Sequence, residues 1–342
     1  MTGWKWYKSD LKNVDKNGLK VLSTFSCGGG SSYGYKLAGY DVLGNVEIDQ
    51  KINSMYVKNH KPKYNFRMDI RDFNSRDNLP EDLKNIDILD GSPPCSTFSM
   101  AGSREEAWGV EKRFREGQKR QVLDDLFMEF LQTVKRLNPK VVVAENVDGM
   151  TRGKAKYYIT MVIKEFKKLG YDVQLFRLNS MFMGVPQSRV RIFFIANRMG
   201  FPKLRIQPSE RPIVYGEIAS RKAVPLNKST KAYGLMKHSM IPSDTCIGDI
   251  NERLYGKNSS FNTSIWRFGK VCPTLIAGGV MYREDICYVP DIDIVSATTF
   301  PQDYDFDGNK PQYVCGMSVP PLMMKYIAKQ IHKQWFMNRK GG

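Results

Sequence analysis

The chain has 342 residues, 42% of them hydrophobic, and its 52 lysines and arginines against 35 aspartates and glutamates give a formal net charge of +17. This length and composition are typical of a globular protein with one large domain, or a large domain and a smaller one, and they exclude a disordered chain. No apolar run is long enough to span a bilayer, and Met1–Asp10 lacks the apolar core of a secretory signal, so a cytoplasmic protein without a membrane partner is expected.

The number and spacing of the cysteines and histidines argue against a metal site and against a set of disulfide bonds. The six cysteines, at positions 27, 95, 246, 272, 287 and 315, form no closely spaced pairs, and the chain has only three histidines. Reduced thiols and no metal site are therefore expected.

The positive charge is concentrated in one region. Residues 151–267 contain 21 lysines and arginines against 7 aspartates and glutamates, a local charge of +14 that leaves +3 for the rest. A clustered excess favours a polyanion partner such as nucleic acid. A membrane surface fits less well, because the region shows no basic amphipathic helix with a bulky apolar face.

A strand and a glycine-rich turn follow a polar lead-in. Val21–Ser26 is expected to be a strand, and residues 27–32 a turn with a serine N-cap candidate before a short helix that ends near Gly39. Glycines at such a turn let a ligand approach the main chain and expose helix N-terminal amides. A turn that serves only the fold is the alternative interpretation.

A second strand, Asp41–Val46, leads to Glu47, which lies 20 residues after Cys27. An acid at this spacing is placed to accept hydrogen bonds from a ribose. The dinucleotide pattern fails, because Tyr33 stands where its last glycine would fall, so another adenosine cofactor is favoured. Lys51–Tyr64 is expected to be a helix, and Asp69 after it is either an adenine contact or a surface acid.

The strand Ile86–Asp90 runs into Pro93-Pro94-Cys95. Consecutive prolines cannot continue a helix or a central strand, so they fix a rigid loop at the strand end, where ligands sit in open α/β sheets. Cys95 is either a buried filler, as free cysteines often are, or a nucleophile presented to a ligand. Its place favours the nucleophile.

A long charged loop and an apolar strand come next. Residues 96–119 are punctuated by glycines and show no period, which favours a mobile lid. A helix over about Gln121–Leu137 has one apolar face, and Val141–Ala144 is fully apolar, as expected in the middle of a parallel sheet. Glu145 follows, either as a surface cap or, if partly buried, as a general acid with a raised pKa.

The next segment predicts a helix, Lys154–Leu169, and a strand pair, Asp172–Leu178 and Arg191–Ala196. Arg189 and Arg191 alternate at the start of the second strand and so point to the same face. That arrangement suits phosphate or carbonyl oxygens, and equally plain solvent.

From about Asn197 to Phe268 the chain is rich in prolines, lysines and serines, which predicts a separate loop-rich domain that carries much of the basic excess. A final helix, Leu322 to about Trp335, is expected to pack on the first sheet. The predicted fold is α/β, a doubly wound, mostly parallel sheet with a second, smaller domain.

Six motifs stand in order along this fold: Phe25 with the glycine turn, Glu47, Pro93-Pro94-Cys95, Glu145-Asn146-Val147, Gln187-x-Arg189-x-Arg191 and Gly316-x-Ser318-Val319. Any one of these motifs is weak evidence for a protein family. All six in this order, with a variable basic stretch before the last, are specific for one family. From about Val21 to His332 the chain resembles the S-adenosylmethionine-dependent DNA (cytosine-5)-methyltransferases of bacteria and phages. The resemblance implies a Rossmann-like catalytic domain of residues 1–196 and 300–342 and a target-recognition domain of residues 197–299.

The implied reaction is methylation of carbon 5 of a flipped-out cytosine in a specific double-stranded DNA sequence, through a covalent cysteine adduct. Carbon 5 is a poor nucleophile, and addition of the Cys95 thiolate at carbon 6 converts the ring into an enamine. By similarity, Glu145 would protonate or hydrogen-bond ring nitrogen 3, Arg191 would hold the carbonyl oxygen, and Arg189 the backbone. A lid over residues 96–119 suits a base that has left the duplex.

The resemblance also implies a pocket for S-adenosylmethionine, formed by Phe25, Gly28, Gly29, Gly30, Glu47, Ile48, Asp69, Ile70, Pro94, Leu126, Ser318 and Val319. Glu47 would bind the ribose and Ile48 would lie against adenine. Three features depart from the family. Cys27 stands where a glycine is usual, Met317 stands where an asparagine is usual, and the usual arginine and glutamate of the preceding motif are not evident near Thr299-Phe300-Pro301.

Two other functions remain open, a transfer-RNA cytosine-5 methyltransferase and a catalytically silent DNA-binding relative. The basic stretch between Arg191 and Arg267 favours DNA over RNA, and the intact Cys95, Glu145 and Arg191 favour an active enzyme. A monomer is expected, and the resemblance is compatible with a cognate restriction endonuclease in the same system.

Overall fold

Two compact units make up the chain in the computed structural model, which describes residues 3–94, 126–152, 155–257, 259 and 263–337. The large-sheet unit comprises Leu11–Asn179, Val190–Gln207 and Met324–Gly342, and the small-sheet unit comprises Met1–Asp10, Ser180–Arg189 and Pro208–Met323. No helix of the described residues is long and apolar enough to cross a membrane.

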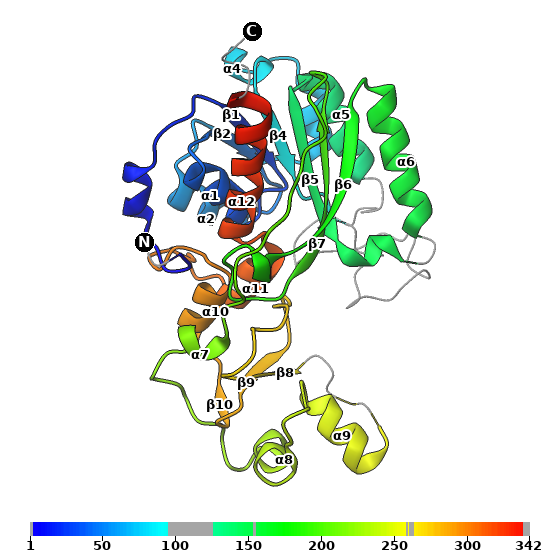
Figure 1. The fold of residues 1–342 in the computed structure, drawn as a ribbon. Helices are drawn as coiled ribbons and strands as arrows, with labels where there is room; N and C mark the ends of the chain where they lie inside the picture. The colour runs from blue at the N-terminus through cyan, green and yellow to red at the C-terminus, as the bar shows by residue number, and fades with distance from the viewer. Residues whose placement is uncertain (1–2, 95–125, 153–154, 258, 260–262, 338–342) are drawn as a thin grey trace. The chain divides into compact units, whose positions relative to one another are not determined.

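The large-sheet unit is built on a seven-stranded sheet with the order β3-β2-β1-β4-β5-β7-β6 (Figure 1). Its strands are β1 (Lys20–Thr24), β2 (Asp41–Val46), β3 (Tyr64–Phe66), β4 (Ile88–Gly91), β5 (Val141–Val147), β6 (Asp172–Asn179) and β7 (Val190–Asn197). The pairs from β3 to β5 are parallel, whereas β7 runs antiparallel to both β5 and β6. The prediction of a doubly wound, mostly parallel sheet is confirmed.

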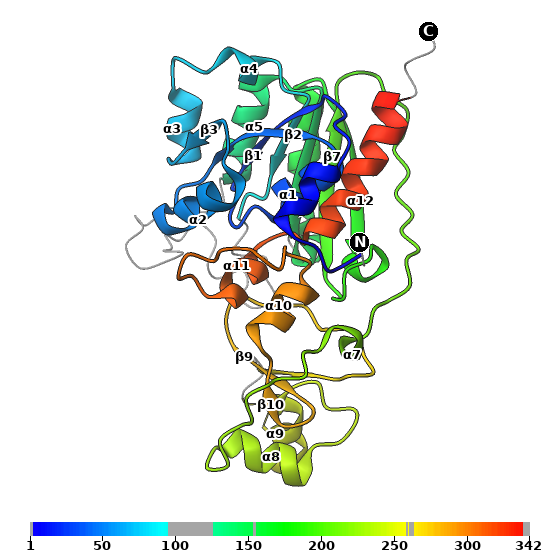
Figure 2. The same ribbon diagram turned by 90° about the vertical axis from the view of Figure 1, so that its left-hand side faces the viewer.

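Helices cover both faces of this sheet (Figure 2). They are α1 (Gly30–Leu37), α2 (Gln50–His60), α3 (Ile70–Ser75), α4 (Glu81–Lys84), α5 (Leu126–Leu137), α6 (Ala155–Lys168) and α12 (Pro321–Ile331), with short turns η1 (Lys8–Asn13), η2 (Asp148–Thr151) and η4 (His332–Phe336). The Tyr40 hydroxyl donates to the Ala328 carbonyl at 2.9 Å, so the C-terminal helix packs on the unit that contains β1, as expected.

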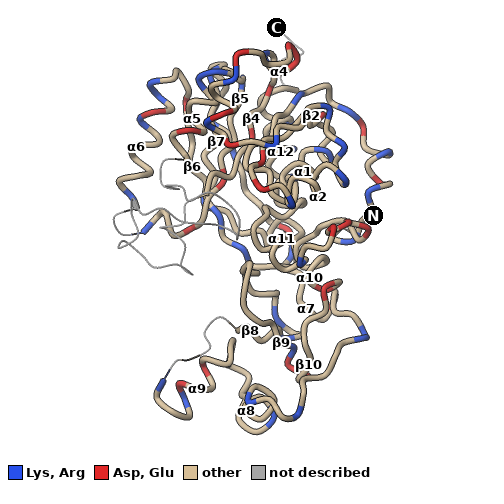
Figure 3. The backbone as a smooth tube through the Cα atoms, turned by 180° about the vertical axis from the view of Figure 1, so that it is seen from behind, with Lys and Arg blue, Asp and Glu red and all other residues tan. Residues whose placement is uncertain are grey.

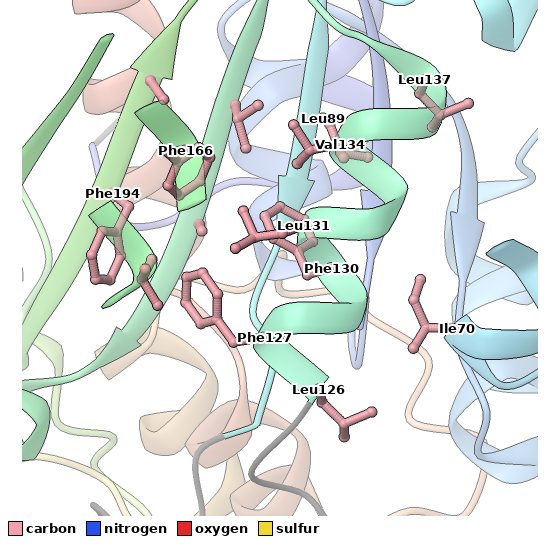
Figure 4. Close-up of a cluster of buried hydrophobic side chains, with 14 of the residues drawn as sticks. Ile70, Leu89, Leu126, Phe127, Phe130, Leu131, Val134, Leu137, Phe166 and Phe194 are labelled. Carbon is pink, nitrogen blue, oxygen red and sulfur yellow. The ribbon is translucent and has the colours of Figure 1, made fainter. Parts of the chain in front are cut away.

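The apolar core of the large-sheet unit lies between the sheet and α5, α6 and α3. Phe127, Phe130 and Leu131 of α5 recur at the spacing of one helical face and point toward the strands (Figure 4). Alternate strand residues such as Leu22 and Leu89 meet them. Full burial of a phenylalanine such as Phe130 contributes about 2–3 kcal/mol.

The small-sheet unit has a sheet and an apolar core of its own. Its strands are β8 (Thr263–Trp266), β9 (Val280–Arg283) and β10 (Cys287–Tyr288), in the order β10-β9-β8, and its helices are η3 (Ser180–Phe182), α7 (Tyr215–Ile218), α8 (Lys231–Ser239), α9 (Ile247–Tyr255), α10 (Asp291–Ala297) and α11 (Pro311–Met317). Leu235 of α8, Ile250 of α9 and Ile265 of β8 belong to one buried cluster. The unit is therefore more regular than the loop-rich domain that was expected.

The two units divide the chain differently from the expected domains. Residues 300–323 belong to the small-sheet unit, where α11 packs on α10 and the Gln302 amide donates to the Trp6 carbonyl at 2.9 Å. Residues 197–207 stay with the large-sheet unit, where the rings of Phe201 and Trp335 stack with centroids 5.5 Å apart. Both contacts join segments that are far apart in the sequence.

The basic excess is divided unequally between the two units. The small-sheet unit contains 15 lysines and arginines against 13 aspartates and glutamates, so it is nearly neutral. The large-sheet unit carries the remaining 37 basic and 22 acidic residues. Figure 3 marks the lysines and arginines in blue along the backbone of each unit. The prediction concerned residues 197–268, which hold 12 basic and 5 acidic residues, so it stays a prediction.

Several predicted elements have different ends. The N-cap of α1 is Gly29 in the left-handed region (φ 72°) and not a serine. Helix α2 ends at His60, because Lys61 adopts φ 45° and the chain then enters β3. Strand β5 extends to Val147, so Glu145 lies inside it. The expected lid over residues 96–119 and the expected first residues of α5, 121–125, lie outside the described residues.

Candidate active site

Two loops with the predicted motifs leave the large sheet at neighbouring strand ends. Strand β1 leads to Phe25–Gly29, and its neighbour β4 leads to Ser92–Pro94. The chain order reverses between these strands, with β2 and β3 on one side and β5 on the other. In doubly wound sheets a crevice at this switch point, beyond the carboxyl ends of the strands, is the usual ligand site.

Every second residue of the glycine loop, residues 25–29, has a left-handed main-chain conformation. Phe25 has φ 51°, Cys27 φ 44° and Gly29 φ 72°. In this conformation the Cys27 amide donates to Glu47 Oε2 at 2.9 Å, and the Asp49 amide donates to Glu47 Oε1 at 3.0 Å. Burial raises the pKa of Glu47, while these amide hydrogen bonds oppose the rise. The loop and the end of β2 are thus joined through one carboxyl group.

His60 supports this loop from α2. Its ring stacks on Tyr56 with centroids 4.3 Å apart and lies 4.0 Å from the Tyr33 ring, while Nε2 is 3.4 Å from the Gly28 carbonyl oxygen. A Cβ at Gly29 would collide with the imidazole, so glycine is required there for close packing as well as for its φ. Sequence reasoning missed His60, because a single histidine on a helix gives no signal of what it packs against.

Strand direction brings Glu145 and Arg191 together. Since β7 is antiparallel to β5, its first residues lie beside the last residues of β5, and Val147 is in register with Arg191. Arg191 Nε is 3.1 Å from Glu145 Oε1, and both side chains are largely buried. Burial lowers the pKa of Arg191, and the Glu145 charge opposes this. A buried pair of opposite charges at strand ends presents a donor and an acceptor in fixed positions.

Asn146 joins this pair to the proline turn. Its side-chain amide donates to the Pro93 carbonyl at 3.1 Å, and its carbonyl oxygen accepts from the Val147 amide at 2.8 Å. Pro93 is buried and Pro94 is partly exposed. Cys95, the next residue, lies outside the described residues. The sequence contained Asn146 within a motif but did not indicate this contact.

Asp90 is the second residue that sequence reasoning missed. It lies in β4, is 2% exposed, and accepts a hydrogen bond from Ser23 Oγ at 3.0 Å. Burial raises its pKa to about 7, against the effect of the hydroxyls of Ser23, Tyr35 and Ser31. An acid inside the short apolar run Ile88–Gly91 was the available signal, since a parallel central strand has no solvent face.

The residues around the glycine loop fit an adenosine cofactor. The first turn of α1 has no side-chain cap, which leaves its amides for an anionic group. Glu47 stands at the end of β2 for a ribose, and Ile48 beside it is 40% exposed, which suits the apolar face of adenine. Phe25 packs against the core beneath.

Other predicted cofactor residues have structural roles. Asp69 caps α3 by accepting from the Arg71 amide at 2.8 Å, and its carboxylate also pairs with the Arg71 guanidinium at 3.3 Å. Ile70 and Leu126 belong to the apolar core. Their contact with a cofactor stays a prediction.

Arg189, Ser318 and Val319 lie in the small-sheet unit. Arg189 is 3% exposed and donates to the carbonyls of Leu275 at 3.1 Å and Gly316 at 2.9 Å, so its guanidinium binds the protein main chain. Ser318 Oγ donates to the Val314 carbonyl at 2.8 Å. Arg189 thus braces the segment that carries the Gly316-x-Ser318-Val319 motif, and its expected role in the active site stays a prediction.

Residues 19–268 match the family described as C-5 cytosine-specific DNA methylase. The chain belongs to this family. The type II methyltransferase M1.HphI of Haemophilus parahaemolyticus is 29% identical to this methylase over 348 residues, which cover 92% of the chain and 87% of that protein. M.FnuDI of Fusobacterium nucleatum is 35% identical over 180 residues, 53% of this methylase and 47% of its own length. The predicted family and enzyme class, DNA (cytosine-5-)-methyltransferase, are confirmed.

Solved structures agree on the fold of the methylase. A putative DNA modification methyltransferase encoded within an E. coli prophage has a TM-score of 0.64 at 20% identity, over 93% of this chain and 99% of that one. A DNMT2 mutant from Spodoptera frugiperda also has a TM-score of 0.64, at 17% identity, over 92% and 99% of the two chains. At these identities the likeness concerns the fold.

Proposed function

We propose that this methylase transfers a methyl group to carbon 5 of a flipped-out cytosine in a specific double-stranded DNA sequence, through a covalent Cys95 adduct. The observation that carries the proposal is the buried Glu145–Arg191 pair, which Asn146 links to the Pro93-Pro94 turn next to Cys95. A nucleophile, a hydrogen-bonding carboxyl group and a guanidinium are thereby expected at one end of the sheet.

The chemistry follows from these groups. The Cys95 thiolate adds to carbon 6, and the ring becomes an enamine whose carbon 5 is nucleophilic. Glu145 holds ring nitrogen 3 and the amino group during this addition, and Arg191 holds the carbonyl oxygen. S-adenosylmethionine, which Glu47, Ile48 and the glycine loop would hold, would supply the electrophilic methyl group and leave as S-adenosylhomocysteine. Loss of the carbon 5 proton and of the Cys95 sulfur then restores the aromatic ring and the free thiol.

The ion pair between Glu145 and Arg191 in the free protein orients both side chains for the proposed cytosine pocket. Arg191 and Glu145 are desolvated and oriented by adjacent strands before any base arrives, so little reorganisation is needed when the base enters. A lone buried charge at either position would be costly, which explains why both are present together.

A suicide substrate tests the mechanism. A DNA duplex with 5-fluorocytosine at the target site lacks the proton that must leave, so the enzyme should remain attached in a denaturant-resistant adduct. Cys95→Ser should abolish the adduct while the variant still binds the cofactor. Failure of the wild-type protein to form an adduct on any DNA, despite cofactor binding, would contradict the proposal.

DNA and transfer RNA are distinguished by competition for methyl transfer from labelled cofactor. The concentration of positive charge favours a polyanion but not one kind, whereas the family of the chain favours DNA. Recognition of the target sequence by the small-sheet unit, a monomeric state and a cognate restriction endonuclease are further parts of the proposal. Methylation mapping of DNA from cells that express the protein would identify the target.

A further inference from the structure

His60, the last residue of α2, is a buried polar ring that reaches the glycine loop. It is 6% exposed, and its ring packs on those of Tyr56 and Tyr33. Its Nε2 lies 3.4 Å from the Gly28 carbonyl oxygen. An unpaired polar group is costly inside a protein, so the nitrogens of such a ring are expected to form hydrogen bonds.

Lys36 of α1 contacts His60 at two other atoms. Its Nζ donates to the His60 carbonyl oxygen at 2.9 Å and lies 3.4 Å from His60 Nδ1. The last carbonyls of a helix have no partner within the helix, so Lys36 satisfies one of those of α2. Lys36 is mostly an ammonium group at pH 7, because burial lowers its pKa only to about 8.

The two neighbours of the His60 ring are compatible with one arrangement of its protons. A carbonyl oxygen can only accept, so Nε2 must carry the hydrogen that is donated to Gly28. An ammonium group can only donate, so Nδ1 must be the acceptor that faces Lys36. These contacts therefore require a neutral imidazole with its hydrogen on Nε2.

The peptide group between Gly28 and Gly29 is held on both sides. His60 contacts its carbonyl oxygen, and its N–H donates to the Ser26 carbonyl at 2.8 Å. A Cβ at Gly29 would collide with the imidazole, so the ring lies directly against this peptide. The Gly29 carbonyl in turn accepts from the Tyr33 amide at 2.9 Å, in the first turn of α1. The orientation of one peptide therefore links the loop to the start of the helix.

We propose that Lys36 and His60 form a positioning pair, in which Lys36 orients the imidazole so that its Nε2–H holds the Gly28 carbonyl and sets the glycine loop for S-adenosylmethionine. This role rests on the proposed function, since it concerns the loop that would hold the cofactor. Both side chains act through the main chain of the loop. Loss of one hydrogen bond predicts a roughly threefold to tenfold lower affinity for the cofactor.

Three substitutions at His60 separate the hydrogen bond from the packing of the ring. His60→Phe keeps an aromatic ring beside Tyr56 but lacks the donor, so affinity for S-adenosylhomocysteine should fall roughly threefold to tenfold. His60→Gln loses the ring but places an amide N–H near the position of Nε2, so affinity should stay within about twofold of the wild type. His60→Asn has an amide too short to reach Gly28 and should bind as weakly as His60→Phe.

Stability should follow a different order from affinity. His60→Phe keeps the packing of the ring and should have a higher unfolding temperature than the two amide variants, which both lose it. Calorimetric titration with S-adenosylhomocysteine and thermal unfolding measure the two quantities on the same samples without any turnover. The expected result is thus a stable variant that binds weakly and a less stable one that binds well.

Lys36→Met tests the second member of the pair. It keeps the length of the side chain and removes the donor to Nδ1, so the ring is no longer oriented and affinity at pH 7 should fall roughly twofold to fivefold. Lys135→Met is the matched control, because Lys135 is an exposed lysine of α5 and its variant loses the same charge. This control should bind S-adenosylhomocysteine like the wild type.

Nitrogen NMR tests the proton arrangement in the protein without cofactor. The chain has three histidines, so isotope-labelled histidine gives few signals, and the signal of His60 is identified by its absence in His60→Gln. At pH 7 its ring hydrogen should be found on Nε2. A hydrogen on Nδ1, or on both nitrogens, would overturn the role of the pair.

The binding results separate the two proposals. Affinities of the three His60 variants that follow their unfolding temperatures would show that the ring acts only by packing, and would overturn the positioning role alone. Wild-type affinity in Lys36→Met would do the same for the pair. Absence of S-adenosylmethionine and S-adenosylhomocysteine binding by the wild type would overturn the proposed function, and this role with it.

Discussion

Cys27 adopts a backbone conformation that is costly for any side chain. Its φ of 44° lies in the left-handed region, where a Cβ costs roughly 1–2 kcal/mol. The resemblance leads us to expect glycine at this position, and the left-handed conformation gives that expectation a physical reason. The conformation is kept because it directs the Cys27 amide to Glu47.

Cys27→Gly should relieve this strain. Glycine has more conformational entropy to lose on folding, so the net increase in the free energy of unfolding should be about 0.5–1 kcal/mol, measured by urea denaturation. Cys27→Ala keeps the Cβ and removes the thiol, and it should leave the stability near the wild-type value. Equal stabilisation by alanine and glycine would show that the thiol, and not the backbone, is responsible.

Asp90 should make stability depend on pH. Its folded pKa, about 7, is above the unfolded value of 3.8, so the folded state binds the extra proton between these values, and stability falls as pH rises from 4 to 7. The free energy of unfolding should fall by at most about 4 kcal/mol over this pH range. Asp90→Asn should lack this component, and chemical denaturation at pH 5 and pH 8 should show a smaller decrease than in the wild type. A decrease of equal size would contradict the buried titration.

At the scale of elements, the junction between β5 and the proline turn depends on one amide. Asn146→Ala leaves the buried Pro93 carbonyl without its donor, which should cost about 1–3 kcal/mol of stability. It should also slow adduct formation with 5-fluorocytosine DNA, because the turn that carries Cys95 loses its anchor. Asn78→Ala, at an exposed position, should change neither quantity. Normal adduct kinetics in Asn146→Ala would argue against this positioning role.

Helix α5 and β4 approach too closely for any side chain at Gly91. A Cβ there would lie 2.6 Å from Phe130 Cε2 and from Thr24 Oγ1, so Gly91→Ala should destabilise the protein by roughly 1–3 kcal/mol. Gly234→Ala in α8 meets open space and should be neutral or stabilise by up to about 1 kcal/mol. Thermal unfolding of the two variants checks the contrast. A neutral Gly91→Ala would mean that Phe130 can move aside at little cost.

For the whole molecule, the charge predicts strong dependence on salt. Each phosphate contact that releases a counterion lowers the logarithm of the affinity in proportion to log salt, so four or more contacts would weaken DNA binding roughly a hundredfold or more between 50 and 200 mM salt. Fluorescence anisotropy with duplex DNA measures this slope, and binding of S-adenosylhomocysteine should change little. Salt-independent DNA binding would contradict a polyanion site.

The strand ends were predictable because the sheet is buried on both faces. Val141–Ala144 is a fully apolar run of the kind found in central parallel strands. Both this strand and Asp41–Val46 were predicted within a few residues of their observed ends. The loops after them followed from the same pattern. The Glu145–Arg191 contact followed only from the resemblance, since no local pattern specifies which strands become neighbours.

What the sequence did not show depends on contacts between distant segments. Arg189 and Arg191 look alike as alternating arginines, yet one binds carbonyls of the small-sheet unit and the other a carboxylate of β5. The Gln302 amide donates to the carbonyl of Trp6, almost three hundred positions away. Asp90 lies in an apolar run of the sequence, but that run does not reveal that Ser23 of β1 donates to its carboxylate.

The reversed direction of β7 has a consequence for how this protein tolerates length changes. Side chains alternate along a strand, and Arg191 faces Glu145 while Ile192 belongs to the core on the other face. One residue inserted after Val190 and before Ile192 would exchange these faces, burying a guanidinium among apolar side chains. The contact of Arg191 with Glu145 thus depends on the number of residues that precede Arg191 in β7. Natural insertions and deletions should therefore be found outside β7.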